Sequence, residues 1–166
     1  SVFIGGNLKL LNIALYRPEI PPNTGNIARL CVGIRANLHI VGTPSFDMSE
    51  KSVRRAGLDY WEHLKLFQHK DWEEFVGTIT DVSRIFLVTK FGKTKYSDQT
   101  YQDNDYFVFG RETSGLPEEI RMSYPDSNQI YIPMTEECRS INLSNAAAIV
   151  VYEAVRQLNL ELKKNV

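Results

Sequence analysis

Short apolar runs alternate with helical patterns along the whole chain, and this alternation limits the fold more than any other feature. Residues 84–89 (RIFLVT) and 106–109 (YFVF) are continuous apolar runs, of the kind that lie buried on both faces of a parallel sheet. Residues 11–16 and 37–41 predict two more short strands, and residues 64–67 predict a weak one. Strands that alternate with helices in this way predict an α/β fold, with a mostly parallel sheet flanked by helices.

The helical patterns differ in length and in how they begin. The proline-rich segment 17–22 predicts an extended lead-in, after which Asn23 or Thr24 caps a helix that ends near Gly33. Residues 144–162 predict one long helix whose apolar side chains cover more than one side. Such a helix suits a homodimer interface and burial within its own fold equally well. Shorter helical patterns cover residues 51–56, 71–79 and 117–122.

Length and composition restrict the class of protein. The 166 residues, 43% of them hydrophobic, suffice for one core, so we expect a single domain over residues 10–166 and an N-terminal tail over 1–9. The formal charge of −1 means that a nucleic acid would have to be attracted by a local patch. The two cysteines lack the spacing of metal ligands, and no apolar run approaches the roughly 20 residues of a membrane span. We therefore expect a cytoplasmic protein without a signal peptide, a metal or a membrane partner.

Two polar loops follow predicted strands. Residues 132–148 (IPMTEECRSINLSNAAA) begin at the end of the apolar run 129–132, which predicts a strand, and contain Arg139, Ser140 and Asn142, which packing alone does not require. Residues 110–117 (GRETSGLP) place an acid between two glycines. Open α/β sheets bind ligands in such loops at the carboxyl ends of strands, although an ordinary strand-to-helix connection also fits 132–148. Neither loop contains GxxxxGK[ST] or GxGxxG, which argues against a phosphate loop and a dinucleotide fingerprint.

A third candidate segment opens the first long helix. Gly25 lies in its first turn, where a missing Cβ lets another backbone or a ligand come close. Arg29 follows one turn later, and its side chain can reach back over the start of the helix. A capped helix with a surface arginine explains the same residues.

Together the three segments resemble the motifs of the SPOUT RNA methyltransferases, and most closely the small single-domain branch that modifies the ribose of the tRNA wobble nucleotide. The residues that carry the resemblance are NTGNIAR at 23–29, FGRETSGLP at 109–117, and IPM and RSINLSNA within 132–146. The resemblance covers about residues 11–158 and keeps the order of the motifs. It implies that the C-terminal segment threads through an earlier loop as a deep trefoil knot, and that the protein is a homodimer through its C-terminal helix.

The resemblance also implies S-adenosylmethionine as the cofactor and tRNA as the substrate. The positions that match cofactor contacts in the family are Val88, Gly110, Ile132 and Ser140, with Leu143 close by. Arg29 is the candidate to polarise or deprotonate the ribose hydroxyl, and Ser140 and Asn142 would orient the groups around it. The pocket would be shaped by Asn23, Glu112 and Arg139. Because arginine resists deprotonation in proteins, stabilising the developing alkoxide is an easier role for Arg29 than acting as a base.

Binding of RNA would require a local concentration of positive charge, and each phosphate contact would make binding sensitive to salt. The candidates are Arg17, Lys51, Arg54, Arg55, Lys90, Lys93 and Lys95. Arg111 stands where proline is common in the wobble branch, and Ser114 stands where arginine can occur, so substrate choice is in doubt. The same motifs also fit a ribose methyltransferase of rRNA or another tRNA site, and an RNA-binding knot protein without catalytic activity.

Overall fold

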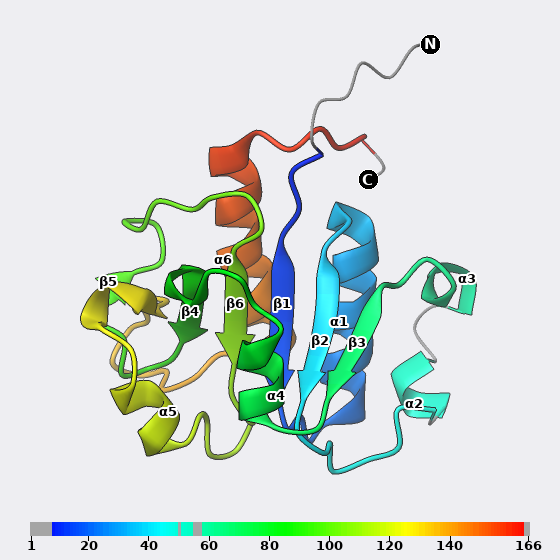
Figure 1. Ribbon diagram of the computed structural model, residues 1–166, viewed down its shortest axis with the longest axis horizontal. Coiled ribbons are helices and arrows are strands. Elements are labelled where there is room, and N and C mark those ends of the chain that lie inside the picture. The colour runs from blue at the N-terminus through cyan, green and yellow to red at the C-terminus, as the bar shows by residue number, and fades with distance from the viewer. Residues whose placement is uncertain (1–7, 50, 55–57, 165–166) are drawn as a thin grey trace.

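Seven parallel strands form one sheet in the computed structural model, which describes residues 8–49, 51–54 and 58–164. The strands are β1 (Asn12–Tyr16), β2 (Asn37–Val41), β3 (Leu66–His69), β4 (Ile85–Val88), β5 (Thr94–Lys95), β6 (Tyr106–Phe109) and β7 (Gln129–Tyr131). Their order across the sheet is β3-β2-β1-β6-β4-β7-β5 (Figure 1). The predicted α/β class with a parallel sheet is confirmed.

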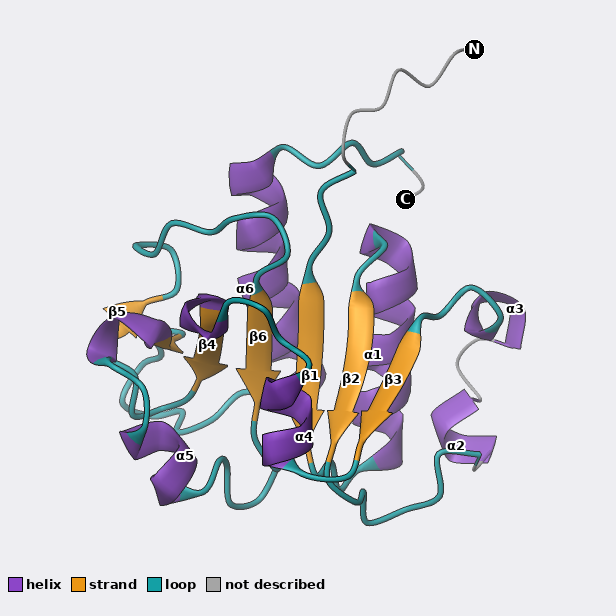
Figure 2. Cartoon of the chain, in the orientation of Figure 1, coloured by secondary structure: helices purple, strands orange, loops and turns teal. Residues whose placement is uncertain are grey.

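Helices cover both faces of this sheet (Figure 2). They are α1 (Pro21–Ile34), α2 (Lys51–Arg54), α3 (Leu58–Trp61), α4 (Trp72–Gly77), α5 (Glu118–Met122) and α6 (Leu143–Leu158), with short 3₁₀ helices at Val82–Arg84 and Asp126–Asn128. Helices α1 and α6 pack on one face, and α4 and α5 pack on the other. Along β1, Ile13 and Leu15 join the core under α1 and α6, whereas Ala14 joins the core under α4 and α5. Because successive side chains of a strand point to opposite faces, a strand covered on both faces must be apolar throughout.

Helix α1 begins earlier than predicted, so the expectation of an extended path through residue 22 was wrong. Ile20 is the N-cap residue, and Pro21 and Pro22 occupy the first turn. Proline is tolerated there because the first N–H groups of a helix have no acceptor within it, and its fixed φ already suits the helix. Neither Asn23 nor Thr24 is therefore the cap.

Helix α6 is also displaced from its prediction. It begins at Leu143, one residue earlier than predicted, because Asn142 is the N-cap residue and its side-chain oxygen accepts hydrogen bonds from the backbone N–H groups of Ser144 and Asn145. The helix ends at Leu158 instead of continuing to residue 162, because Asn159 adopts the left-handed conformation with φ 52°.

Smaller deviations concern the short elements. Strand β3 starts at Leu66, two residues later than predicted, because Leu66 is the first residue that pairs with β2, through Leu38. Pro117 is the N-cap residue of α5 rather than part of its first turn. Helix α3 and strand β5 had no prediction. The predicted helix 51–56 is observed as α2, and its last two residues lie outside the described part of the chain.

The C-terminal part of the chain passes through the long loop that joins β4 to β6. Strand β7 lies between β4 and β5, which are consecutive in the sequence. Farther along the same loop, the side-chain amide of Gln157 in α6 donates to the carbonyl of Gln99 (2.9 Å) and its oxygen accepts from the N–H of Tyr101 (2.9 Å). The loop therefore encloses the segment that leads from β7 into α6, which is the predicted trefoil knot.

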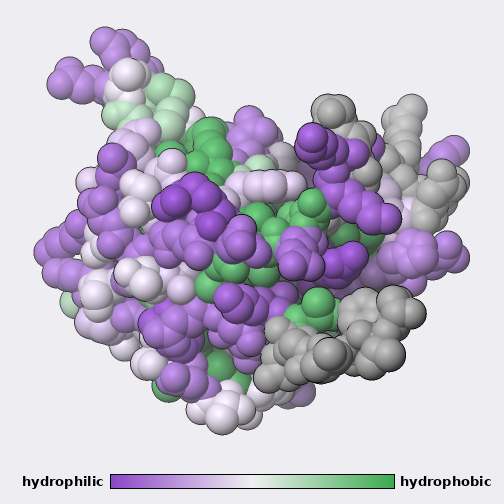
Figure 3. Space-filling model, turned by 90° about the horizontal axis from the view of Figure 1, so that it is seen from above, coloured by the Kyte–Doolittle hydropathy of each residue, from purple (hydrophilic) through white to green (hydrophobic). Residues whose placement is uncertain are grey.

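Large apolar side chains are exposed at both ends of the sheet. Seen from the amino ends of the strands, hydrophilic side chains surround an apolar area (Figure 3), and Leu8 and Val82 are exposed at this end. At the carboxyl ends, Ile20, Phe91 and Met134 are exposed. These three side chains line one cleft.

Candidate active site

A cleft of about 720 Å³ opens at the carboxyl ends of β4, β6 and β7. Its walls come from residues 88–91 after β4, residues 109–116 after β6, and the segment between β7 and α6. Ile20, Asn23 and Arg121 complete the lining. The volume lies within the range of small-molecule sites, and the position is where open α/β sheets bind ligands.

Nine of the ten predicted site residues line this cleft. They are Asn23, Val88, Gly110, Glu112, Ile132, Arg139, Ser140, Asn142 and Leu143. They come from parts of the chain up to 120 residues apart, because Asn23 stands at one end of the set and Leu143 at the other. The fold thus brings the predicted motifs to one place.

Arg29 is the exception. It is exposed on α1, and its guanidinium carbon lies 5.9 Å from the centroid of the Tyr60 ring. It follows Asn23 by six residues, which places it about 9 Å farther along the helix axis and on a different face. Within one chain, the structure does not bring Arg29 to the cleft.

The loop after β6 closes on itself at two glycines. The N–H of Arg111 donates to the carbonyl of Gly115 (3.2 Å), and the N–H of Gly115 donates back to the carbonyl of Arg111 (2.9 Å). A Cβ on Gly110 would lie 2.4 Å from backbone atoms of Gly115 and Leu116, and Gly115 itself has φ +67°. Glycine is therefore required at both positions for this wall of the cleft to form.

Two carboxylates join this loop to the segment before α1. Glu112 accepts hydrogen bonds from the N–H groups of Glu19 (2.8 Å) and Ile20 (3.3 Å). In return Glu19 accepts from the N–H (3.1 Å) and the hydroxyl (2.8 Å) of Thr113, and these bonds lower the pKa of Glu19. The sequence analysis predicted a role for Glu112 but missed Glu19. The available signal for Glu19 was that it is an acidic residue within the proline-rich segment 17–22.

Asn142 joins the start of α6 to α1. Its side-chain N–H donates to the side-chain oxygen of Asn23 (3.0 Å), and its own oxygen accepts from the N–H (2.9 Å) and the hydroxyl (2.6 Å) of Ser144. Both ends of the Asn142 amide are thus engaged, which fixes the orientation of this side chain at the edge of the cleft.

The lining of the cleft is positively charged although the chain as a whole is not. One carboxylate, Glu112, lines it, and both oxygens of that group already accept backbone N–H donors. The lining cations are Lys90, Arg111, Arg121 and Arg139. Of the predicted RNA contacts only Lys90 belongs to this set, and Arg55 lies outside the described residues. Arg121 was missed because nothing in its sequence context shows that α5 lies beside the cleft.

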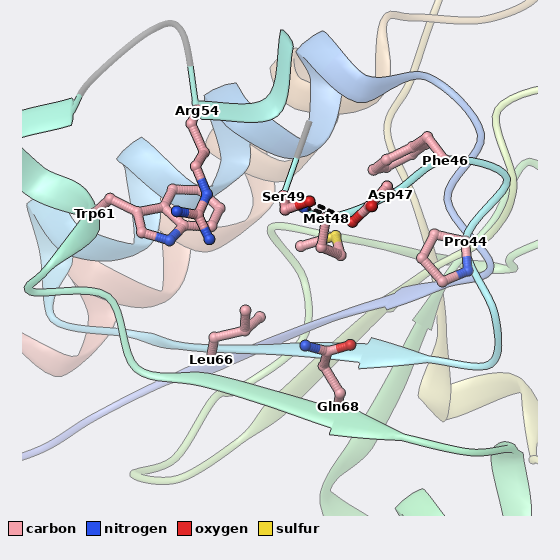
Figure 4. A pocket seen from close by; sticks show the side chains of 9 residues that line it. All are labelled: Pro44, Phe46, Asp47, Met48, Ser49, Arg54, Trp61, Leu66 and Gln68. Atoms are coloured by element: carbon pink, nitrogen blue, oxygen red, sulfur yellow. Dashed lines mark hydrogen bonds between the residues drawn. The ribbon is translucent and has the colours of Figure 1, made fainter. Parts of the chain in front are cut away.

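A second hollow of about 400 Å³ lies beside β3, between the loop after β2 and helices α2 and α3. Figure 4 shows Arg54 over the Trp61 ring on one side of it, 5.1 Å from the ring centroid, and Asp47 on the other. The Asp47 carboxylate accepts from the N–H (2.9 Å) and hydroxyl (2.7 Å) of Ser49. Arg54, one of the predicted RNA contacts, lines this hollow, but none of the predicted catalytic or cofactor-binding residues is in its described lining, so it does not compete with the cleft as the reaction site.

Among the residues that the structure describes, no three His, Cys, Asp or Glu side chains are grouped so that they could hold a metal ion. Within the same residues, every helix is too short or too polar to cross a membrane.

Comparison with known proteins identifies the family. The model of the SpoU rRNA Methylase family matches residues 10–152. The chain belongs to this family. Among its relatives is the tRNA (cytidine(34)-2'-O)-methyltransferase of Escherichia coli (strain K12), which is 48% identical over 149 residues, or 90% of this chain and 94% of that protein.

Solved structures of the SpoU family and its relatives agree with the observed topology. A structure that describes the 2-OH methylation of C/U34 on tRNA superposes with a TM-score of 0.87 at 36% identity, over 92% of this chain and 99% of that chain. The SpoU methyltransferase AviRb from Streptomyces viridochromogenes, in complex with the cofactor AdoMet, superposes with a TM-score of 0.78 at 27% identity, over 94% of this chain and 63% of that chain.

Proposed function

We propose that this chain is an S-adenosylmethionine-dependent methyltransferase that acts on the ribose 2'-hydroxyl of nucleotide 34, a cytidine or a uridine, in tRNA. The observation that carries the proposal is the single cleft in which three separate motifs meet. The relative from Escherichia coli, 48% identical, has a name that states this activity on cytidine 34.

The cleft suits a cofactor of this kind. Val88, Gly110, Ile132, Ser140 and Leu143 would hold S-adenosylmethionine, with the apolar side chains against its flat and aliphatic parts. Backbone groups at the ends of parallel strands have no partner in the sheet, so they are free to bind the polar edges of the ligand. When bound, the cofactor supplies a methyl group made electrophilic by a positively charged sulfur.

The chain's own residues would prepare the ribose hydroxyl. Its oxygen must stand in line with the methyl group at near-attack distance, and loss of its proton must become easier. We assign the orientation of the ribose to Ser140 and Asn142, because Asn142 is held at both ends of its amide. Arg139 lines the same cleft and adds positive charge close to the RNA.

Arg29 would act across a homodimer formed through α6. Arg29 is exposed on α1, which packs against α6 in the same core. Tyr152 of α6 is a large side chain that is 50% exposed and could contact a second copy. A second copy packed there would allow Arg29 to enter the partner's cleft, where a permanently protonated guanidinium would stabilise the developing alkoxide.

The four lining cations favour an anionic substrate such as tRNA. We place the protein in the cytoplasm, where tRNA is modified.

Methylation of defined RNAs tests the proposal. The protein, labelled S-adenosylmethionine and tRNA transcripts are incubated, and nuclease digestion with mass spectrometry locates the methyl group. We expect one 2'-O-methyl at nucleotide 34, and none in a transcript that carries a 2'-deoxy residue there. Methylation of that deoxy transcript, or of ribosomal RNA in preference to tRNA, would contradict the proposal.

A further inference from the structure

Phe91 lies on the rim of the cleft, and 55% of it is exposed. The backbone around it is held firmly against β7, since the N–H of Thr89 donates to the carbonyl of Ile130 (3.0 Å) and the N–H of Lys93 donates to that of Gln129 (3.1 Å). The exposure of the ring is therefore fixed by the turn that carries it.

The turn itself is shaped to make this placement possible. A Cβ on Gly92 would lie 2.7 Å from the backbone of Ile130, so only glycine lets the turn lie this close to β7. The N–H of Gly92 donates to the carbonyl of Thr89 (3.0 Å), and the N–H of Phe91 donates to the Thr89 hydroxyl (3.2 Å). An aromatic ring is thus presented on a rigid turn at the entrance to the cleft.

Two cations accompany the ring. The guanidinium carbon of Arg121 lies 4.2 Å from its centroid, and the ammonium of Lys90 lies 5.2 Å from it. Neither cation forms an ion pair with an acidic side chain among the described residues, and within them the Nε of Arg121 has no hydrogen-bond partner. Helix α5 is held in place here, because the Gln129 side chain donates to the Arg121 carbonyl (2.8 Å).

We propose that Phe91, supported by Arg121, is a stacking platform for the nucleobase next to the methylated nucleotide, and that Lys90 and Arg121 bind the phosphate beside that base. The proposal rests on the proposed function and adds to it a second contact with the same RNA. Its task is to hold a neighbouring base so that the target ribose points into the cleft.

The chemistry of the rim favours RNA over other partners. Single-stranded RNA is bound by aromatic rings that stack on bases, together with cations that follow the phosphates. Phe91 provides the ring, and Lys90 and Arg121 provide two cations within 5.2 Å of its centroid. An apolar protein partner would remove water from both cations without supplying a negative charge, and burying an unpaired charge in this way costs free energy.

Binding and turnover of an anticodon stem-loop test the platform. For Phe91→Ala we expect the Kd and KM for this RNA to rise about tenfold, as the loss of one base stack would produce. The kcat at saturating RNA and the Kd for S-adenosylmethionine should stay within about a factor of two of the wild type, since Phe91 is not among the residues that would hold the cofactor. Phe91→Tyr keeps an aromatic face and should restore binding.

The contacted base is identified with stem-loops that carry an abasic residue on the 5′ or the 3′ side of the target. With one of these RNAs, the wild type and Phe91→Ala should bind equally, because the partner of the ring is already missing. Met122→Ala is the matched control, since Met122 is 75% exposed beside Arg121 and does not line the cleft.

Three results would overturn the proposal: unchanged RNA affinity in Phe91→Ala, a full tenfold effect with both abasic RNAs, or a loss of cofactor affinity in place of RNA affinity. Failure of the proposed function is a separate result. It would appear as a wild-type protein that leaves nucleotide 34 unmethylated, and the binding measurements decide on the platform in that case as well.

Discussion

The two halves of the sheet are built on different principles. In the half β1-β2-β3, strands that are neighbours in space follow one another in sequence, and their buried polar side chains bind each other. His39 is hydrogen-bonded through Nδ1 to Nε2 of His69 (2.9 Å) and through Nε2 to the side-chain oxygen of Asn12 (3.2 Å). In the half β6-β4-β7-β5, the chain returns through its own loop, and the polar groups of distant segments face a cleft.

The difference indicates where function and stability are located. A locally assembled region can satisfy its polar groups internally, which stabilises the fold but leaves nothing for a ligand. A region assembled from distant loops keeps polar groups at the edge of a cavity. Changes in the knotted half should therefore affect methyl transfer first, and changes in the other half should affect the free energy of unfolding.

The largest expected effect is that of Gly110→Val. The new side chain would collide with the backbone of Gly115 and Leu116, which its Cβ would approach to 2.4 Å, and the displaced loop would close the cleft. We expect cofactor affinity, measured by calorimetry, to fall about a hundredfold or more, because the clash costs about 3 kcal/mol. Gly77→Val is the control, since a Cβ at that glycine would meet no atom within 4 Å apart from its chain neighbours and the backbone of its own helix. Normal cofactor binding by Gly110→Val would refute the assignment.

Arg29→Ala should abolish methyl transfer while leaving cofactor affinity nearly intact, because Arg29 lies outside the cleft of its own chain. Mixing this variant with Gly110→Val tests the action across a dimer. Random exchange should restore roughly a quarter of wild-type activity, since half of the dimers would contain one intact site of two. If Arg29 acts within its own chain, the mixture stays inactive. Turnover by Arg29→Ala at the wild-type rate would remove the residue from the mechanism.

The other half of the sheet should respond to pH. Burial, with a smaller contribution from His69, lowers the pKa of His39 from 6.5 to about 4. In the unfolded chain His39 is protonated as the pH falls below about 6.5, whereas in the folded chain it is protonated only near pH 4. The unfolded state therefore binds more protons between these values, and the free energy of unfolding falls as the pH falls through this range. The loss should be on the order of 3 kcal/mol.

Urea unfolding between pH 4 and pH 7 measures this slope. His39→Gln should flatten it, whereas His63→Gln, at a histidine with 68% of its side chain exposed, should not. The same slope in His39→Gln as in the wild type would exclude His39 as its source.

The smallest effect separates two roles of Asn142. Asn142→Ala removes both the cap of α6 and the bond to Asn23, and should lower the free energy of unfolding by about 1–2 kcal/mol. Asn142→Asp keeps an oxygen for the cap but loses the N–H that binds Asn23, so it should recover most of the stability while kcat stays low. Full activity in Asn142→Asp would show that the bond to Asn23 is dispensable.

Several features of the fold and the cleft were predictable from the sequence because their causes are local. The strand at 106–109 is apolar because both of its faces are covered, and the loop at 110–115 needs glycines because it closes on itself. The prediction for the start of α1 was wrong, and the cause is local as well. Proline fits the first turn of a helix as readily as it fits an extended segment.

Other features depended on contacts that no local pattern records. The exposure of Phe91 depends on its turn packing against β7, which lies some 40 residues farther along the chain. Arg121 reaches the cleft because α5 is tied to Gln129. Arg29 lies outside the cleft on another face of α1, where its guanidinium lies over the Tyr60 ring.

By itself, the sequence determined the α/β class, the positions of most strands and the loops that line the cleft, because side-chain alternation and backbone freedom act over a few residues. The tertiary structure alone decided that β7 enters between β4 and β5, that the cleft gathers positive charge, and that Arg29 lies outside it. These outcomes depend on which distant segments meet, and that is set by the packing of the whole chain rather than by any single stretch of it.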